Sequence, residues 1–276
     1  MGGRINTNLS ALFSSRQLNL TQATQDKILR RLASGFRINT AADDAAGLAI
    51  SQRLEALSRG FEQSQANLQD SVSALQVAEG GISQTGETLQ RIRELSLQAA
   101  NDTLTDADRQ IIQQEVNQLV QEIDRSTSSV EFNGQKLLSG QFSAANGGFT
   151  VQAGTNEGET ISVAIDEVSS TTLGVNGLDV STRSAASNAL STLDTAIERV
   201  STQRARIGAD RNRIQQATEF VGVARENTLA AQSRIRDADF ANQVTKLAIS
   251  QIKNQSGVAA LAQSNIRSQN LLQLLG

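Results

Sequence analysis

The side chains best suited to chemistry are two pairs of carboxylates, Asp43 with Asp44 and Asp237 with Asp239. Carboxylate oxygens are preferred ligands of hard cations such as Ca²⁺ and Mg²⁺, so each pair could contribute to a metal site. Both pairs also stand at a junction between predicted helices, where aspartate commonly caps a helix by accepting hydrogen bonds from its first N–H groups. Because no third ligand type converges on either pair, we predict helix caps here and no metal.

The composition offers little else for catalysis. The 276-residue chain contains no Cys and no His, so it lacks disulfides, thiolate ligands and the commonest general base. The glycines of Asn146-Gly147-Gly148 do not stand between a strand and a helix, as in a phosphate-binding loop, and are typical of a turn. We therefore predict no cofactor and no enzymatic activity. Four Asn-x-Ser/Thr triplets are weak candidates for glycosylation, at Asn8, Asn19, Asn101 and Asn254.

The charge and hydropathy exclude two further classes. A formal net charge of −3 and a pI near 5.2 argue against a nucleic-acid partner. The Lys and Arg residues are spread along the sequence, and we interpret them as solvated helix faces. The first residues lack the apolar run of a secretory signal peptide, and no apolar stretch of about 18 residues is present. Taken alone, these features predict a cytoplasmic protein without membrane insertion.

Two apolar repeats, one in each half of the chain, predict the helices that form the framework of the fold. In each repeat, every seventh residue is apolar, which marks a helix with one buried seam. Because neither seam can be buried alone, we predict that the two helices pack on each other as a long antiparallel coiled-coil rod. The predicted core residues of the rod are Leu54, Phe61, Leu68, Leu75, Ile82, Leu89, Leu193, Val200, Ile207, Ile214 and Val221.

The predicted fold is mainly α, with a small β-hairpin region where the chain reverses. Asn133-Gly134 follows Phe132 and is typical of a type I′ hairpin turn. Gly35 is expected to end the first helix in a left-handed cap, and Thr105 to open a later helix as a capping box. The predicted segments are an N-terminal assembly helix with its connector (1–43), rod helices (44–129), the β-hairpin region (130–182), the C-terminal rod helix (183–236) and a C-terminal assembly helix (237–276).

The two terminal helices have incomplete apolar faces that do not continue the central repeat, and such helices are marginal by themselves. One interpretation is that they pack on each other within a single chain. The alternative, which we favour, is that they pair only when other copies of the chain bury them, as segments that fold on binding do. A coiled-coil scaffold or a secretion-needle protein would fit equally well. The residues expected to drive assembly are Leu9, Leu12, Ile28, Leu32, Leu261, Ile266, Leu271 and Leu275.

Several stretches closely resemble bacterial flagellins. They include ASGFRINTAADDAAG at residues 33–47, INTN at 5–8, LQRIREL at 89–95, FNG at 132–134 and SRIRDADFA at 233–241. The resemblance covers nearly the whole chain in the right order and includes the leucine-rich C-terminal end. Departures are mild, since Ala33, Phe36 and Ala42 stand where the family more often has Ser, Leu and Lys. Many flagellins carry outer variable domains between the two halves, so the resemblance implies a short form without them.

The resemblance implies a structural subunit that self-assembles into the extracellular filament of the bacterial flagellum and serves motility. In the family, the terminal helices line the inside of a helical tube, and the chain is exported unfolded through the flagellar secretion channel. The implied partners are copies of the chain itself, an export chaperone, and the cap and junction proteins. The alternative is a hook–filament junction (hook-associated) protein, which shares the flagellin-like ends. The abundance of the chain in sheared filaments would separate the two.

The resemblance also implies recognition by the host Toll-like receptor that detects flagellin. The family's recognised stretch matches Leu89 to Gln98 here, with support from the neighbouring helix. The contact residues that carry over are Arg91, Leu95 and Glu115. The alternative interpretation is that Arg91 and Glu115 form ion pairs on the helix surface and that Leu95 packs between helices.

Overall fold

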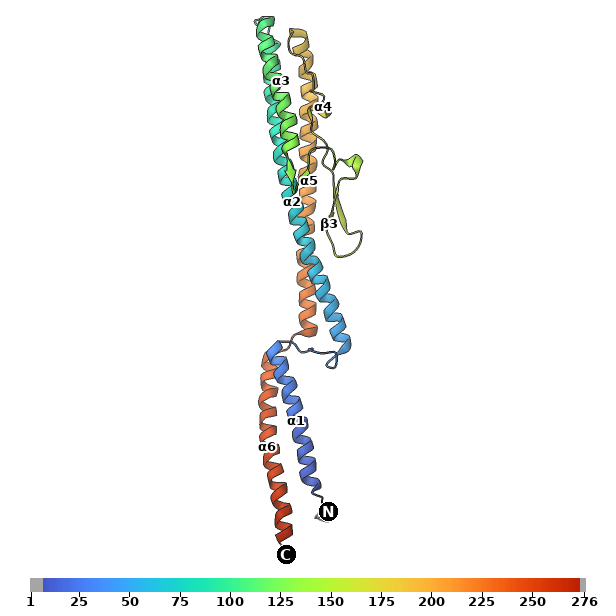
Figure 1. The fold of residues 1–276 in the computed structure, drawn as a ribbon, viewed down its shortest axis with the longest axis vertical. Coiled ribbons are helices and arrows are strands. Elements are labelled where there is room, and N and C mark those ends of the chain that lie inside the picture. Colours follow the sequence, from blue (N-terminus) through green and yellow to red (C-terminus); the bar gives the residue numbers. More distant parts are fainter. Residues whose placement is uncertain (1–6, 274–276) are drawn as a thin grey trace. The chain divides into compact units, whose positions relative to one another are not determined.

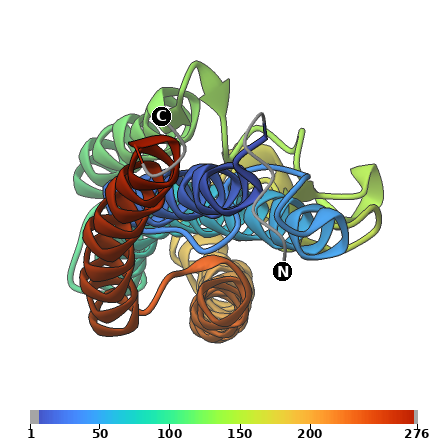
Figure 2. The same ribbon diagram turned by 90° about the horizontal axis from the view of Figure 1, so that it is seen from below.

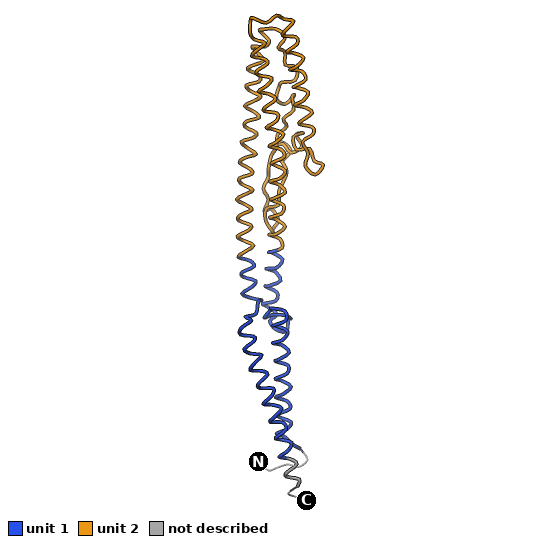
Figure 3. Tube along the Cα trace, turned by 90° about the vertical axis from the view of Figure 1, so that its left-hand side faces the viewer, with its two compact units in different colours: residues 1–58, 227–276 blue, residues 59–226 orange. Residues whose placement is uncertain are grey.

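The computed structural model describes residues 7–273, with side chains described for residues 7–267. The chain divides into two compact units, residues 1–58 with 227–276 and residues 59–226 (Figure 3). The described residues contain six α-helices and two small antiparallel hairpins, which confirms the predicted mainly α fold class. The two units are described separately below.

In the unit of residues 59–226, two long helices lie side by side, α2 (Ala45–Ala99) and α5 (Arg183–Arg236), whose remaining residues belong to the other unit (Figure 1). Their direction is antiparallel, because residues that descend in number along α2 pair with residues that ascend along α5. Arg93 contacts Asp194 at 2.7 Å, and Glu79 contacts Arg211 at 3.0 Å.

The apolar repeats of α2 and α5 lie in one cluster of buried side chains. Of the predicted rod residues, Leu54 and Phe61 are half-buried and the others are buried. A seven-residue spacing keeps these side chains on one stripe of each helix, so both stripes can contribute to the same core. The free energy that each of these side chains contributes to folding stays a prediction.

Helix α3 (Asp106–Ser129) runs back along α2 and adds its own apolar stripe to this core. Its first turn carries the predicted capping box: Thr105 Oγ1 accepts a hydrogen bond from the N–H of Asp108, and Asp108 accepts one from the N–H of Thr105. Arg109, in the first turn of α3, is buried, and its guanidinium donates to the carbonyls of Ala99 and Asn101 in the segment before the helix. The bond to the Ala99 carbonyl caps the last residue of α2, where the carbonyls of a helix have no partner within the helix.

Short strands fill the stretch between α3 and α5. The first hairpin, β1 (Glu131–Phe132) with β2 (Gln135–Lys136), turns at Asn133 and Gly134, whose φ angles are 51° and 74°. Positive φ at both positions defines the predicted type I′ turn. The second hairpin pairs β3 (Phe149–Gln152) with β4 (Thr160–Val163) and lies outside the helices (Figure 2). A 3₁₀ turn, η1 (Ala144–Asn146), and a short helix, α4 (Ser170–Leu173), complete the connection.

The other unit contains the paired terminal helices α1 (Leu9–Ser34) and α6 (Phe240–Gln273). They are antiparallel: Asn8 donates to the carbonyl of Ser264 at one end, and Phe36 bridges Asp237 at the other. Gly35, with φ of 73°, ends α1 in the predicted left-handed cap. The guanidinium of Arg236, the last residue of α5, lies 4.1 Å from the centre of the Phe36 ring, which holds the end of α5 against the connector after α1.

Candidate functional site

Of the two arrangements left open by the sequence, the structure shows the terminal helices packed on each other within one chain (Figure 1). Their buried and half-buried side chains recur at alternating spacings of three and four, which is the pattern of a coiled-coil seam. The seam consists of Ala11, Ser14, Leu18, Thr21, Gln25, Ile28 and Leu32 in α1, and of Gln243, Leu247, Ser250, Asn254, Gly257, Leu261 and Ser264 in α6.

Most of this seam is polar or small. A stable two-helix seam needs large apolar residues at these positions, and here they alternate with Ser, Thr, Gln and Asn. The hydroxyl of Ser250 donates to the carbonyl of Thr21 at 3.5 Å, a long contact between the two helices. The pairing of α1 with α6 is therefore weakly supported by its own interior.

Many large apolar side chains of the two helices are exposed to solvent, and two of them, Leu20 and Ile249, also line a groove between α1 and α6. Phe13, for example, is 67% exposed. Large apolar surfaces of this extent usually mark sites that contact another molecule. The exposed set comprises Leu9, Leu12, Phe13, Leu20, Leu29, Phe240, Val244, Ile249, Ile252, Val258 and Ile266. We call this set the outer apolar surface.

The predicted assembly residues divide between the two surfaces. Leu9, Leu12 and Ile266 belong to the outer apolar surface, whereas Ile28 is buried in the seam and Leu32 and Leu261 are half-buried there. The side chain of Leu271 and all of Leu275 lie outside the described residues. The sequence analysis did not predict Phe13 and Phe240 as assembly residues. The chain has only eight Phe residues, and the presence of these two in polar helices was a signal that could have found them.

The carboxylate pairs act mainly as caps and anchors. Asp44 accepts the N–H of Gly47 at the start of α2, and Asp239 accepts the N–H of Asn242 at the start of α6. Asp43 contacts Lys27 Nζ at 2.6 Å. This contact, with the N–H groups of Asn39 and Thr40, holds the pKa of the Asp43 carboxyl well below its ordinary value. Asp43 therefore stays ionised and ties the connector to α1.

The terminal helices have an excess of basic over acidic side chains. Helices α1 and α6 together contain one acidic residue, Asp26, although the whole chain has a net charge of −3. The basic side chains of the two helices are Arg16, Lys27, Arg30, Arg31, Lys246, Lys253 and Arg267. Four of them, Lys27, Arg31, Lys246 and Lys253, line one groove between α1 and α6, although α1 and α6 stand at opposite ends of the sequence.

The three residues predicted to contact a receptor are not equivalent. Arg91 and Glu115 are exposed and joined by an ion pair of 3.1 Å between α2 and α3, and Arg91 also contacts Glu94 at 3.2 Å. The two carboxylates raise the pKa of the Arg91 guanidinium. Leu95 is only 3% exposed, so the expectation that it offers a surface contact is corrected: its side chain packs in the core.

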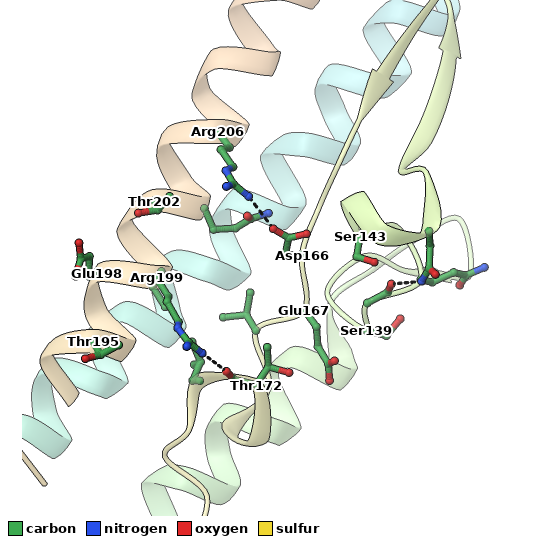
Figure 4. A pocket seen from close by; sticks show the side chains of 17 residues that line it. Ser139, Ser143, Asp166, Glu167, Thr172, Thr195, Glu198, Arg199, Thr202 and Arg206 are labelled. Carbon is green, nitrogen blue, oxygen red and sulfur yellow. Dashed lines mark hydrogen bonds and ion pairs between the residues drawn. The ribbon is translucent and has the colours of Figure 1, made fainter. Parts of the chain in front are cut away.

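A cavity of about 1060 Å³ lies between α5 and the loops beside the hairpins (Figure 4). Two arginines of α5 bridge it to those loops. Arg206 contacts Asp166 at 2.9 Å, and Arg199 donates to the carbonyl of Thr172 at 2.6 Å. These contacts tie the strand region to the helix and form no arrangement of nucleophile and base, which supports an architectural role for the cavity walls.

The described residues contain neither a cluster of metal ligands nor a membrane-spanning helix. No group of three or more Asp or Glu side chains gathers as a metal site within residues 7–267. In the same part of the chain, no helix has both the length and the apolar character needed to cross a bilayer.

Comparison with known proteins places both halves of the chain in one family. Residues 5–143 match the bacterial flagellin N-terminal helical region, and residues 190–275 match the bacterial flagellin C-terminal helical region. The flagellar filament 33 kDa core protein of Treponema phagedenis is 42% identical over 98% of this chain and 99% of its own length. Flagellin of Bacillus subtilis (strain 168) is 39% identical over 99% of both chains.

Among solved structures, a protein of Vibrio parahaemolyticus described as flagellar hook-associated matches with a TM-score of 0.57. The match covers 71% of this chain and 100% of that chain at 17% identity, and such a likeness shows the fold alone. The family is shown by the sequence matches, which span nearly the full length of relatives that form flagellar filaments. The chain belongs to the bacterial flagellin family, and its function is that of a structural filament subunit and not of an enzyme.

Proposed function

We propose that copies of this chain polymerise through the outer apolar surface of α1 and α6 into the extracellular filament that drives bacterial motility. The observation that carries the proposal is the reversed polarity of the terminal pair, with a polar seam inside and large apolar side chains outside. Burying one such aliphatic side chain contributes about 1.5–3 kcal/mol. Copies that cover one another's outer surfaces would therefore gain more than the seam provides.

The kind of polymer follows from symmetry. A contact between two different surfaces of identical chains repeats indefinitely unless its rotation closes into a ring. Membership of the flagellin family favours the open, helical outcome. The finished filament would then contain many copies, each with its terminal helices covered by neighbours.

Export completes the proposal. We propose that the chain reaches the cell exterior unfolded through the flagellar secretion channel, accompanied by an export chaperone and then met by cap and junction proteins. The absence of Cys and an aromatic content of 3% are compatible with such a route, since nothing crosslinks the chain before it folds. A hook–filament junction role is less favoured, because the full-length relatives named above are flagellins and filament core proteins.

A single-residue test of the assembly surface is Phe13→Ser. We expect purified chains with this change to elongate filament seeds at least tenfold more slowly, because a fully covered phenylalanine contributes about 2–3 kcal/mol to the contact. Far-ultraviolet circular dichroism should be unchanged, since Phe13 is already exposed in the single chain. Light scattering after seeding gives the elongation rate.

Phe220→Ser is the matched control, since it removes a phenylalanine of similar exposure from α5. We expect it to slow elongation less than Phe13→Ser does. Elongation of the Phe13→Ser chain at the wild-type rate would contradict the assignment of the outer apolar surface.

We further propose that the ion pair of Arg91 and Glu115 contributes to recognition by the flagellin-sensing Toll-like receptor. The proposal rests on the family resemblance and on the exposure of both side chains. Leu95 would act indirectly, by holding α2 against its neighbours.

A double substitution, Arg91→Ala with Glu115→Ala, should lower receptor signalling by monomer at least tenfold while leaving the melting temperature nearly unchanged, because exposed ion pairs contribute little to stability. Leu95→Ala should instead lower the melting temperature, since truncating a buried leucine costs about 2–5 kcal/mol. The control is Arg125→Ala with Glu122→Ala, an exposed ion pair elsewhere on α3. Equal signalling by all three variants would reject the proposal.

A further inference from the structure

A groove of about 470 Å³ runs between α1 and α6. Four of its lining residues are basic: Lys27 and Arg31 on α1, and Lys246 and Lys253 on α6. The chain has only four lysines, and three of them line this one groove. The spacing of seven residues between Lys246 and Lys253 places both on the same side of α6, facing the groove.

One carboxylate outside the groove, that of Asp43, pairs with two of the four cations and balances one positive charge. Asp43 contacts Lys27 at 2.6 Å and Arg31 at 3.7 Å. Lys246 and Lys253 have no carboxylate oxygen within 4.0 Å among the described side chains. The groove thus keeps an unbalanced positive charge, in a pair of helices whose single acidic residue, Asp26, does not line it.

Two buried polar atoms at the groove also lack partners. Gln243 lines the groove and is 5% exposed, and its Oε1 accepts no hydrogen bond from the described residues. The Nε atom of Arg31 likewise donates to none of them. A buried polar atom without a partner is costly, so both atoms favour a bound group that can donate and accept hydrogen bonds.

We propose that this groove binds a phosphate group, either free or carried on a small ester. A phosphate supplies the missing negative charge to Lys246 and Lys253 and an acceptor to the Arg31 Nε–H. Hydrogen phosphate also carries a P–O–H donor that matches Gln243 Oε1, whereas sulfate at neutral pH carries none. A ligand that touches both helices would strengthen a pair whose seam is otherwise weak. Leu20 and Ile249 of the outer apolar surface also line the groove, so the binding is tested on the single chain, before filaments assemble.

In the test, inorganic phosphate is titrated into the full-length, unseeded chain at constant ionic strength, and isothermal titration calorimetry measures the binding. We expect saturable binding of one phosphate per chain, at least threefold tighter than sulfate. Lys246→Gln with Lys253→Gln should weaken phosphate binding at least tenfold. Both lysines are exposed and glutamine is a good helix former, so the helix should remain intact, which circular dichroism verifies.

Lys136→Gln is the matched control, because it removes the fourth lysine, in β2, outside the groove. It should leave the affinity within twofold of wild type. Gln243→Leu should remove the preference for phosphate over sulfate. Glycerol phosphate serves as the ester probe, because its doubly ionised phosphate keeps the negative charge but has no P–O–H donor for Gln243 Oε1. Affinity equal to that of inorganic phosphate indicates that the groove reads the charged oxygens alone, and weaker binding indicates free phosphate as the ligand. No saturation, or an equal loss in the Lys136→Gln control, would overturn the proposal.

Discussion

A chain cut to residues 44–236 should remain helical and monomeric, and it should not elongate filament seeds under conditions where the full chain polymerises. The cut removes α1 and α6 and with them the whole outer apolar surface. It leaves untouched the buried cluster that α2, α3 and α5 share, so the loss should concern association and not folding. Light scattering after seeding measures elongation, and size-exclusion chromatography measures the oligomeric state.

The expected size of this effect is large because many side chains act together. At about 1.5–3 kcal/mol for each fully buried aliphatic group, even a few of the outer residues exceed the free energy that separates millimolar from nanomolar association. A cooperative melting transition of the shortened chain is the control for folding. Seeds that grow at the wild-type rate from the shortened chain would mean that assembly uses other surfaces, and the proposed function would lose its main support.

The central helices could be predicted from sequence because their pattern is apolar and regular. Leu75 and Ile207 each belong to an uninterrupted seven-residue repeat, and such a repeat specifies both the helix and its buried side. Local chemistry was equally informative at Asn133-Gly134 and at Thr105, where the type I′ turn and the capping box each need particular residue types. These signals depend on neighbours in sequence, which are available without a structure.

The terminal seam escaped sequence reasoning for a physical reason. Its register is a heptad, but Thr21, Gln25 and Ser250 occupy positions where a search for apolar periodicity finds nothing. The large apolar residues that do attract attention, such as Leu12, lie on the outside. A sequence therefore reveals an apolar stripe without telling which partner covers it, and here that partner is not the sister helix.

Two further features depend on contacts that sequence distance conceals. Lys27 and Lys246 are more than two hundred residues apart, so their common groove appears only once α1 and α6 are paired. Leu95 and Arg91 occur in one short motif and, four residues apart, lie on nearly the same side of α2. Even so, Leu95 is buried in the shared core, whereas Arg91 is exposed and pairs with Glu115. A resemblance between motifs indicates which residues of this chain correspond to those of the family. The exposure of each side chain has to be read from the structure.

Ile207→Asp should lower the free energy of unfolding more than any other single substitution named above. Ile207 is fully buried in the shared cluster, so the change removes its packing and places a carboxylate where water cannot reach it. Arg211, one turn away, is already held by Glu79 at 3.0 Å, outside this buried stripe. The combined cost should be about 4 kcal/mol or more, which for a chain of this size lowers the melting temperature by about 10 °C or more.

Ala209→Asp provides the matched control, because it adds the same charge to the same helix at an exposed position. Its melting temperature should stay within about 2 °C of wild type, since surface substitutions typically change stability by less than about 0.5 kcal/mol. Melting followed by circular dichroism compares the three chains. If Ile207→Asp melted with the wild type, the side chain would have to reach solvent, and the antiparallel packing of α2 on α5 would be wrong. If both variants had lowered melting temperatures, the added charge on α5 would explain the loss of stability. The result would then give no support to a buried position of Ile207.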